Sequence, residues 1–222
     1  MDRHFFEELN SLKDLLLSMG GLAEEMVAIA VKSLVEHDVK LLETISENEA
    51  KVNRLQVDID EYCLKLIALH QPTASDLRFL LGISKINAEL ERVGDHAVNI
   101  SKGISKVLEH KQMKPFIDMP QMVEIVSIMF KESLHAFVNL AVEKAYSILC
   151  RDDQVDQLRY KIIQELVDIM TKDPLKVGIA VNLILIVNSF EKIADHATNI
   201  AEVVIFVARG KDVRHHFTDP LS

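Results

Sequence analysis

The feature that most constrains this chain is a sequence motif that occurs twice. Residues 91–100 read ERVGDHAVNI and residues 191–200 read EKIADHATNI, so both reduce to E-[RK]-[VI]-x-D-H-A-x-N-I. A second pair, ENEAKVNRL at residues 47–55 and CRDDQVDQL at residues 150–158, repeats at nearly the same separation. Two motifs repeated in the same order predict a duplicated structural unit, so the fold has to accommodate two equivalent halves.

The sequence around these motifs has the period of an α-helix. Apolar side chains recur every three or four residues, beginning with Leu9, Leu12, Leu16 and Met19. The pair Gly20–Gly21 is expected to kink or loosen its helix rather than end it. The pattern predicts six helices, at residues 5–36, 39–69, 75–109, 121–151 and 152–170, and from the break TKDPLK to residue 209.

Proline-containing segments mark the breaks between these helices. In HQPTASD, Pro72 suits the first turn of a helix, and Ser75 and Asp76 suit its N-terminal positions. The segment EHKQMKPFIDMPQ contains two prolines and is the best candidate for a linker between the halves. We therefore predict an all-α fold of two tandem, internally repeated three-helix bundles, with residues 1–112 as the first bundle, residues 113–209 as the second and residues 210–222 as a polar surface tail.

Composition narrows the class of protein. A formal net charge of −9 argues against binding to a nucleic-acid backbone, which requires a basic surface. Cys63 and Cys150 belong to no short-range motif, so we expect two buried free thiols in a reducing compartment. The N-terminus lacks the pattern of a signal peptide, and no apolar run reaches the roughly 20 residues of a membrane span. A cytoplasmic protein that does not span the membrane is expected.

The duplicated motifs carry rows of oxygen-bearing side chains. Glu91 and Asp95 are one helical turn apart on one face, and the corresponding pair in the second half has the same spacing. The aligned positions on the second helix of each half are also acidic or amide residues. The candidate metal ligands are Glu49, Glu91, Asp95, Asp152, Asp156, Glu191 and Asp195, with Asn53, Asn99 and Asn199 as weaker candidates.

These rows can be interpreted in two ways. Like charges one turn apart destabilise a helix by a few tenths of a kcal/mol, and a cation between two rows would reverse that effect. Oxygen ligands suit Mg²⁺, Ca²⁺, Mn²⁺ or iron, whereas zinc more usually requires His or Cys. In an acidic protein the same residues could instead form a solvated helix face. His96 and His196 point elsewhere on their helices and are expected to lie on the helix surface or to form hydrogen bonds between helices, rather than bind metal.

Other enzyme motifs are weak or absent from the sequence. Glu132 and His135 form a single ExxH, whereas ferritin-like di-iron bundles require that motif on two helices. The chain contains no GxxxxGK, GxGxxG or GxSxG motif, so nucleotide hydrolysis and acyl transfer have no support.

Nearly the whole chain resembles the PhoU family. The resemblance is carried by LSMGGLAEEM, by HQPTASDLRFLLGISKINAELERVGDHAVNI and by NSFEKIADHATNIAEVVIFVARGKDVRH. It implies two similar three-helix bundles that bind iron, zinc, magnesium or manganese through E(D)xxxD motifs. It also implies a non-enzymatic homodimer that negatively regulates the phosphate-starvation response and restrains phosphate uptake. The implied partners are the ATPase subunit of the phosphate ABC transporter and a phosphate-sensing histidine kinase.

Carried over position by position, the motif of the family falls on both halves but not equally. Glu49 is present on the second helix, yet Asn53 replaces the second acid there. We therefore expect the first bundle to bind metal more weakly, or to bind fewer ions, than the second. Two alternatives are a carboxylate-ligated metalloenzyme, either hydrolytic or oxidative, and a purely structural helical scaffold.

Overall fold

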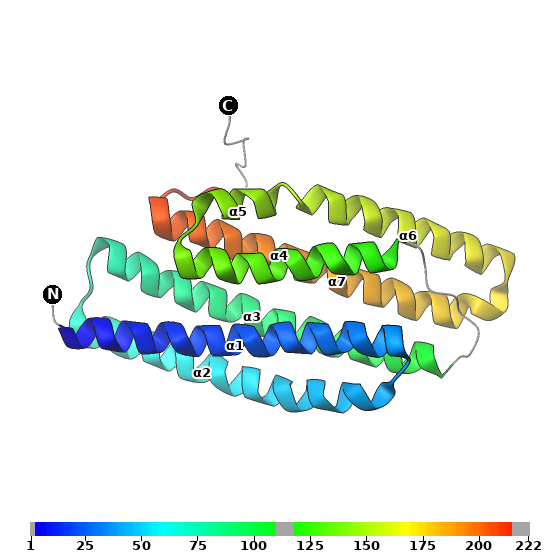
Figure 1. Cartoon of the computed structure of the whole chain (residues 1–222), viewed down its shortest axis with the longest axis horizontal. Helices are drawn as coiled ribbons and strands as arrows, with labels where there is room; N and C mark the ends of the chain where they lie inside the picture. Colours follow the sequence, from blue (N-terminus) through cyan, green and yellow to red (C-terminus); the bar gives the residue numbers. More distant parts are fainter. Residues whose placement is uncertain (1–2, 110–117, 215–222) are drawn as a thin grey trace.

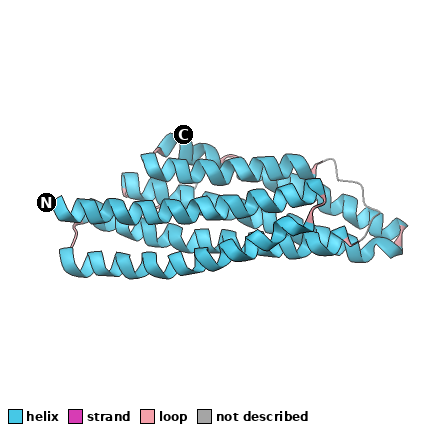
Figure 2. Ribbon diagram, turned by 60° about the horizontal axis from the view of Figure 1, so that its bottom comes forward, coloured by secondary structure: helices cyan, strands magenta, loops and turns pink. Residues whose placement is uncertain are grey.

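The computed structural model describes residues 3–109 and 118–214, and these residues form helices without any strand (Figure 1). The long helices all run along the longest axis of the molecule (Figure 2). In chain order the elements are α1 (Arg3–Glu36), the 3-10 helix η1 (Val39–Leu42), α2 (Glu43–His70), α3 (Ala74–Leu108), α4 (Met119–Asn139), α5 (Val142–Leu149), α6 (Asp152–Lys172), the 3-10 helix η2 (Pro174–Lys176) and α7 (Val177–Arg209).

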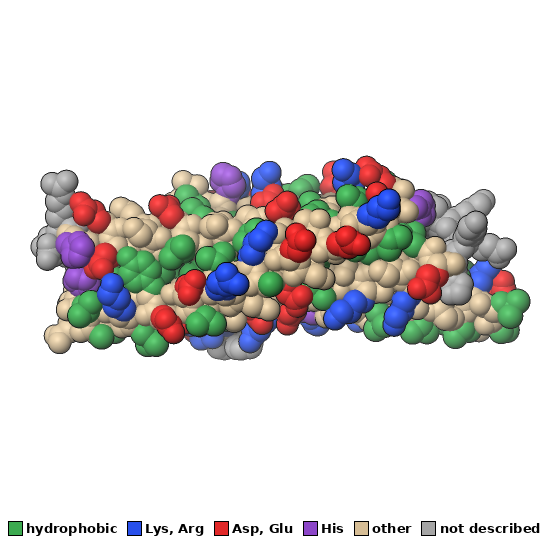
Figure 3. Space-filling model, turned by 90° about the horizontal axis from the view of Figure 1, so that it is seen from below, with side chains coloured by type: hydrophobic (Ala, Val, Ile, Leu, Met, Phe, Trp, Pro, Cys, Tyr) green, Lys and Arg blue, Asp and Glu red, His purple; other side chains and the backbone are tan. Residues whose placement is uncertain are grey.

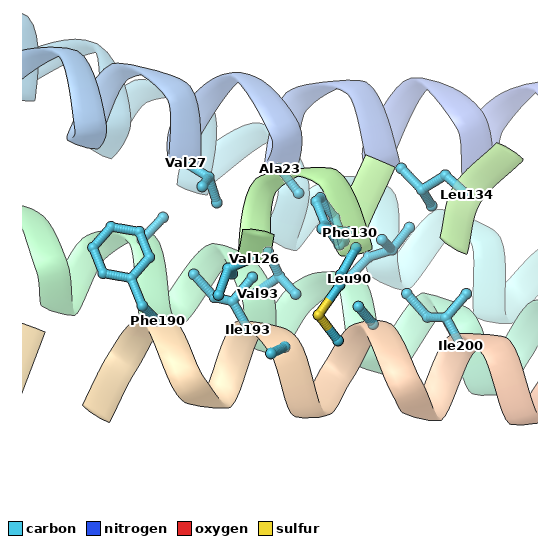
Figure 4. Close-up of a cluster of buried hydrophobic side chains, with 14 of the residues drawn as sticks. Ala23, Val27, Leu90, Val93, Val126, Phe130, Leu134, Phe190, Ile193 and Ile200 are labelled. Carbon is cyan, nitrogen blue, oxygen red and sulfur yellow. The ribbon is translucent and has the colours of Figure 1, made fainter. Parts of the chain in front are cut away.

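The two predicted bundles are present, and they share one core. Helices α1, α2 and α3 pack together, as do α4 to α7, while α3 and α7 lie side by side at the centre (Figure 1). Figure 4 shows Val27 of α1, Leu90 of α3, Phe130 of α4 and Ile193 of α7 meeting in one apolar cluster. The duplication therefore produces two bundles joined face to face rather than two separate domains.

The predicted fourth helix is wrong in one respect, because residues 121–151 form two helices. Helix α4 ends at Asn139, where Leu140 adopts a left-handed conformation with a φ of 47°. The Leu140 N–H donates to the carbonyl groups of Ala136 and Phe137, and α5 begins at Val142. Because no Gly or Pro marks this position, the apolar period alone did not indicate the break.

The other helix ends agree more closely with the sequence. Helix α1 continues through Gly20–Gly21, as expected. Pro72 lies before α3 rather than in its first turn, since Thr73 is the N-cap and α3 begins at Ala74. Ser75 and Asp76 lie in the first turn, as predicted.

Two predicted boundaries are only partly covered by the structure. The predicted boundary between residues 112 and 113 lies outside the described residues. Of the predicted tail, only residues 210–214 are described, and there Val213 is buried in the core. That part of the tail is therefore packed against the helices and is not only a polar surface segment.

The thiols differ from each other, although both were expected to be buried. Cys63 on α2 is buried, whereas Cys150 lies exposed at the end of α5. The prediction that Cys150 is buried was wrong, because this residue lies in the short turn between α5 and α6 and its side chain is exposed to solvent. Neither thiol forms a disulfide.

The charges on the surface and the composition of α7 both bear on the expected class of protein. Acidic and basic side chains are interspersed on the face drawn in Figure 3, without a continuous basic stripe there.

Within the described residues, only the segment Pro174–Arg209 has the length and apolar composition of a membrane-crossing helix. Half of its most apolar window is buried inside the molecule, where α7 packs against α3 and α4. The composition of α7 is thus that of a central core helix.

Candidate functional site

The acidic rows of the second bundle face each other across α6 and α7. Asp152 lies half-buried in the first turn of α6. Burial and, after it, the negative charges of Asp195, Asp156, Asp153 and Glu191 together raise the pKa of the Asp152 carboxyl to about 6. Since Asp195 and Glu191 belong to α7, the predicted rows on the two helices are close enough to repel each other.

A lysine lies between two of these acids. The Nζ atom of Lys192 is 2.7 Å from Oδ2 of Asp195 and 3.3 Å from Oε2 of Glu191. These carboxylates raise the pKa of Lys192, the largest cause being the hydrogen bond to Asp195. The ammonium group thus supplies one positive charge to a cluster of four carboxylates, which leaves most of the repulsion around Asp152 uncompensated.

The donor chemistry of this cluster fits a hard cation. Asp152, Asp156, Glu191 and Asp195 offer carboxylate oxygens, which are the ligands preferred by Mg²⁺ and Mn²⁺. Among residues 3–109 and 118–214, no three His, Cys, Asp or Glu side chains already converge closely enough to hold a metal ion. A cation would therefore have to draw the carboxylates together and take the place of the Lys192 ammonium group.

The corresponding site in the first bundle is less acidic. Burial raises the pKa of Glu91, and the neighbouring charge of Asp95 on the same helix adds to the effect. On α2, Glu49 is half-buried and Asn53 is exposed, and in the described part of the chain neither forms a hydrogen bond or ion pair. The acids on α3 therefore lack the opposing acid pair that α6 provides in the second bundle.

The two weaker amide candidates on the central helices lie elsewhere. The amide nitrogen of Asn199 donates to Oε2 of Glu89 on α3 at 2.9 Å. Asn99 is exposed and lines a groove between α3 and α7. The structure thus brings Asp152, Glu191 and Asp195 together and places both amides away from that cluster.

The repeated histidines lie at the centre of the interface between the bundles. Nδ1 of His196 on α7 is 2.7 Å from Oε2 of Glu89 on α3, so His196 forms a hydrogen bond between helices, which was one of the two expected arrangements. The rings of His96 and His196 are 5.4 Å apart, and Nδ1 of His96 is enclosed without a hydrogen-bond partner in the described structure. Burial lowers the pKa of His96, and the charge of His196 lowers it further.

Glu89 is the acid that joins the bundles. Burial raises its pKa, but the hydrogen bonds from His196 and Asn199 lower it by more, so the net shift is downward. Arg92 adds an ion pair at 3.1 Å. The sequence analysis missed Glu89 because it lies just before the repeated motif and its counterpart, Ser189, is not acidic.

The single ExxH motif does not form a metal site with neighbouring acids. Oε2 of Glu132 lies 2.6 Å from Nη1 of Arg151, and Oε1 lies 3.8 Å from Nζ of Lys144. The carboxylate is thus already paired with two cations, which weakens the di-iron interpretation further.

Comparison with known proteins identifies relatives along nearly the whole chain. The family model for the PhoU domain matches twice, at residues 16–104 and 119–204. The chain is 36% identical over 216 residues to the phosphate-specific transport system accessory protein PhoU homolog of Pseudomonas aeruginosa, which covers 97% of this chain and 89% of the relative. It is 31% identical over 218 residues to the accessory protein PhoU of Escherichia coli, covering 98% of this chain and 90% of that relative.

Solved structures agree with these relatives. The crystal structure of PhoU from Pseudomonas aeruginosa superposes with a TM-score of 0.90 at 35% identity, over 93% of this chain and 100% of that one. The phosphate transport system regulatory protein PhoU from Streptococcus pneumoniae superposes with a TM-score of 0.87 at 30% identity, over 94% and 99%. The two matched regions correspond to the two bundles of the fold.

Proposed function

The chain belongs to the PhoU family, and on that basis we propose that it is an accessory regulator of phosphate transport. The observation that carries this proposal is the match of both repeats to the PhoU domain, together with relatives that align with 95% or more of the chain and are named as phosphate-transport accessory proteins. That naming favours a regulator over the alternative of a carboxylate metalloenzyme.

The proposed regulator works by contact with partners. It acts in the cytoplasm as a homodimer and negatively regulates the phosphate-starvation response. Its partners are the ATPase subunit of the phosphate ABC transporter and the phosphate-sensing histidine kinase. These partners are proposed because the chain belongs to this family. Its relatives are named as accessory proteins of a phosphate-specific transport system, which supports contact with components of such a system.

We also propose that the second bundle holds a cation. Asp152, Asp156, Glu191 and Asp195 would bind it, and the raised pKa of Asp152 supports this because a cation would relieve the repulsion that raises it. By drawing α6 and α7 together, the ion would stiffen the surface that a partner contacts.

Genetic complementation tests the regulatory role. If PhoU represses the phosphate-starvation response, a reporter of that response should be expressed even in abundant phosphate in a bacterium that lacks its own PhoU. We expect this chain to restore repression in high phosphate and to allow expression in low phosphate. Co-purification with the ATPase subunit or the sensor kinase from the same cells tests the partners.

A variant separates regulation from folding. Asp152→Asn combined with Asp195→Asn removes two charges of the acidic cluster and is expected to leave the helical content unchanged. Loss of repression with normal protein abundance supports a role of the cluster in signalling. If the parent chain is abundant but does not restore repression, and captures neither partner, the proposed function is wrong.

A further inference from the structure

The interface between α3 and α7 carries two grooves that are related by the internal repeat. The first, of about 270 Å³, is lined by Lys85, Glu89 and Arg92 of α3 and by Glu202 and Phe206 of α7. The second, of about 320 Å³, is lined by residues at the positions equivalent to these, with the two helices exchanged. Those residues are Leu185, Ser189 and Lys192 of α7 and Lys102 and Lys106 of α3.

The first groove is neutral because its cations are paired. Nη1 of Arg92 is 3.1 Å from Oε1 of Glu89, and Nε of Arg214 is 3.0 Å from Oδ1 of Asp212. The Nζ atom of Lys85 lies 4.9 Å from the centre of the Phe206 ring. With Glu202, the three cations of this groove are matched by three carboxylates.

The second groove has lost these acids. Ser189 stands where the first groove has Glu89, and Lys102 stands where it has Glu202. Lys106 takes the place of Phe206. The groove is therefore lined by three lysines and by no carboxylate among the described residues.

Two of these lysines are free to bind an added anion. Lys102 and Lys106 are exposed and form no ion pair within the described part of the chain, whereas Lys192 is already held by Asp195 and Glu191. They are four residues apart on α3, which spaces them by about 6 Å along the helix axis. The groove therefore presents two exposed, unpaired cations although the net charge of the chain is −9.

Amide groups supply hydrogen-bond donors beside the lysines. Oδ1 of Asn188 accepts a hydrogen bond from Arg159 at 2.9 Å, which leaves its amide nitrogen as a donor. Asn99 is exposed in the same groove and also carries an amide nitrogen. Ammonium and amide donors are the groups that bind phosphate oxygens in proteins.

From these observations we propose that this groove, which we call the lysine groove and define by Asn99, Lys102, Lys106, Asn188 and Lys192, binds an anion that carries two or more phosphoryl groups. Its volume is at the lower end of the range for small-molecule sites. Two linked phosphoryl groups carry more negative charge and more acceptor oxygens than one, so each can pair with one of the two lysines, and they should bind more tightly than a single phosphoryl group. The lysine groove adjoins the acidic cluster and shares Lys192 with it, but the anion would be bound by Lys102 and Lys106, which are not part of that cluster. The proposal does not depend on the proposed regulatory role.

The same phosphoryl chemistry is available from a soluble molecule or from a lipid headgroup. Calorimetric titration of the full chain with pyrophosphate and with inorganic phosphate, in metal-free buffer of low ionic strength, tests the soluble source. Flotation with phosphatidylcholine vesicles that contain or lack cardiolipin, a lipid whose headgroup links two phosphoryl groups, tests the lipid source. We expect pyrophosphate to bind more tightly than inorganic phosphate.

Variants locate the site. Lys102→Gln with Lys106→Gln is expected to weaken pyrophosphate binding about tenfold, and Lys102→Glu, which installs the acid of the first groove, at least as much. The matched control is Lys85→Gln with Arg92→Gln in the first groove, for which the affinity should equal that of the parent chain. Circular dichroism confirms that each variant is folded.

Three outcomes decide the proposal. Pyrophosphate binding that is lost only in the lysine-groove variants supports a soluble ligand. Binding to cardiolipin vesicles that is lost in the same variants, without pyrophosphate binding, supports a lipid headgroup. Absence of binding to either probe, or equal weakening in the variants of both grooves, overturns the proposal.

Discussion

The two cysteine residues differ in their exposure to solvent, and this difference predicts different reactivities of their thiols. Burial raises the pKa of the Cys63 thiol to about 12, with a smaller contribution from Asp60, so almost no reactive thiolate is present at pH 8. Cys150 is exposed. We therefore expect a thiol reagent at pH 8 to modify one cysteine per folded chain rapidly and the second only after unfolding.

The variant Cys150→Ser is the control for this assignment. It should abolish the rapid reaction and leave the reaction of the denatured chain at one thiol. Rapid modification of two thiols in the folded parent would show that Cys63 is accessible and that the packing around α2 is looser than described.

A second residue, Glu89, is predicted to stabilise the interface between the bundles. Glu89→Gln should lower the free energy of unfolding by about 1–3 kcal/mol at pH 7, because it weakens the charge-assisted bond to His196. The folded-state pKa of Glu89 lies below its ordinary value of 4.5, so the charged group contributes stability above that pH. This contribution is lost as the pH falls through the lowered pKa.

Urea unfolding of parent and variant at pH 7 and below pH 4 measures the effect. The difference between them should be large at pH 7 and small at the lower pH. Glu61→Gln, at an exposed position on α2, is the matched control and should change little. A variant as stable as the parent at pH 7 would show that the Glu89 bond contributes nothing to the interface.

At the scale of residues, the sequence predicted where the acidic side chains lie better than it predicted the groups that they contact. The spacing of Glu191 and Asp195 placed both acids on one helix face, and the repeat indicated Asp152 as their neighbour. The sequence could not indicate that the ammonium group of Lys192 forms ion pairs with those acids, since its position depends on the conformation of a flexible side chain. Glu89 was missed because its bond to His196 joins residues 107 positions apart.

Among the elements, α3 and α7 approach closely where α3 has glycine. A Cβ atom on Gly82 would lie 2.5 Å from Cγ2 of Val207, and one on Gly103 would lie 2.7 Å from Cγ1 of Ile186. Gly82→Ala and Gly103→Ala should each destabilise the protein by about 1–2 kcal/mol, since overpacking outweighs the gain in helix propensity. Thermal or urea unfolding measures the change.

Gly21 provides the control for these two variants. A Cβ atom there meets nothing within 4 Å, so Gly21→Ala should stabilise the chain by about 0.5–1 kcal/mol through helix propensity alone. If all three substitutions stabilise the protein, the close contact between α3 and α7 is not a constraint on the fold.

The break at Leu140 shows what the repeat could have added to the helical period. Leu140 aligns with His37, which follows α1, and both residues adopt left-handed conformations with φ values of 47° and 56°. The first helix of each bundle therefore ends at an equivalent position. The sequence analysis placed a helix end at residue 36 but none at the aligned residue 139, and the alignment of the two halves could have transferred the first end to the second.

For the whole molecule, the repeat predicted two bundles but not how they join. Side chains from α1, α3, α4 and α7 form one core, so the stability of one bundle depends on the other. Duplication also left two equivalent sites that have since diverged, with an acidic row on α6 that α2 lacks. This asymmetry in charge leads us to place the cation in the second bundle, and it gives the account its most direct test.

That test is the metal content per chain of untagged protein purified without chelators. In one variant, Asp152→Asn, Asp156→Asn, Glu191→Gln and Asp195→Asn remove the acids of the second bundle. In the matched variant, Glu49→Gln, Glu91→Gln and Asp95→Asn remove those of the first. We predict bound metal in the parent, most of it retained in the first-bundle variant and little in the second-bundle variant. Equal metal content in all three chains, or none after incubation with Mg²⁺, Mn²⁺, Fe²⁺ and Zn²⁺, would contradict the account and assign the acids to a solvated helix face.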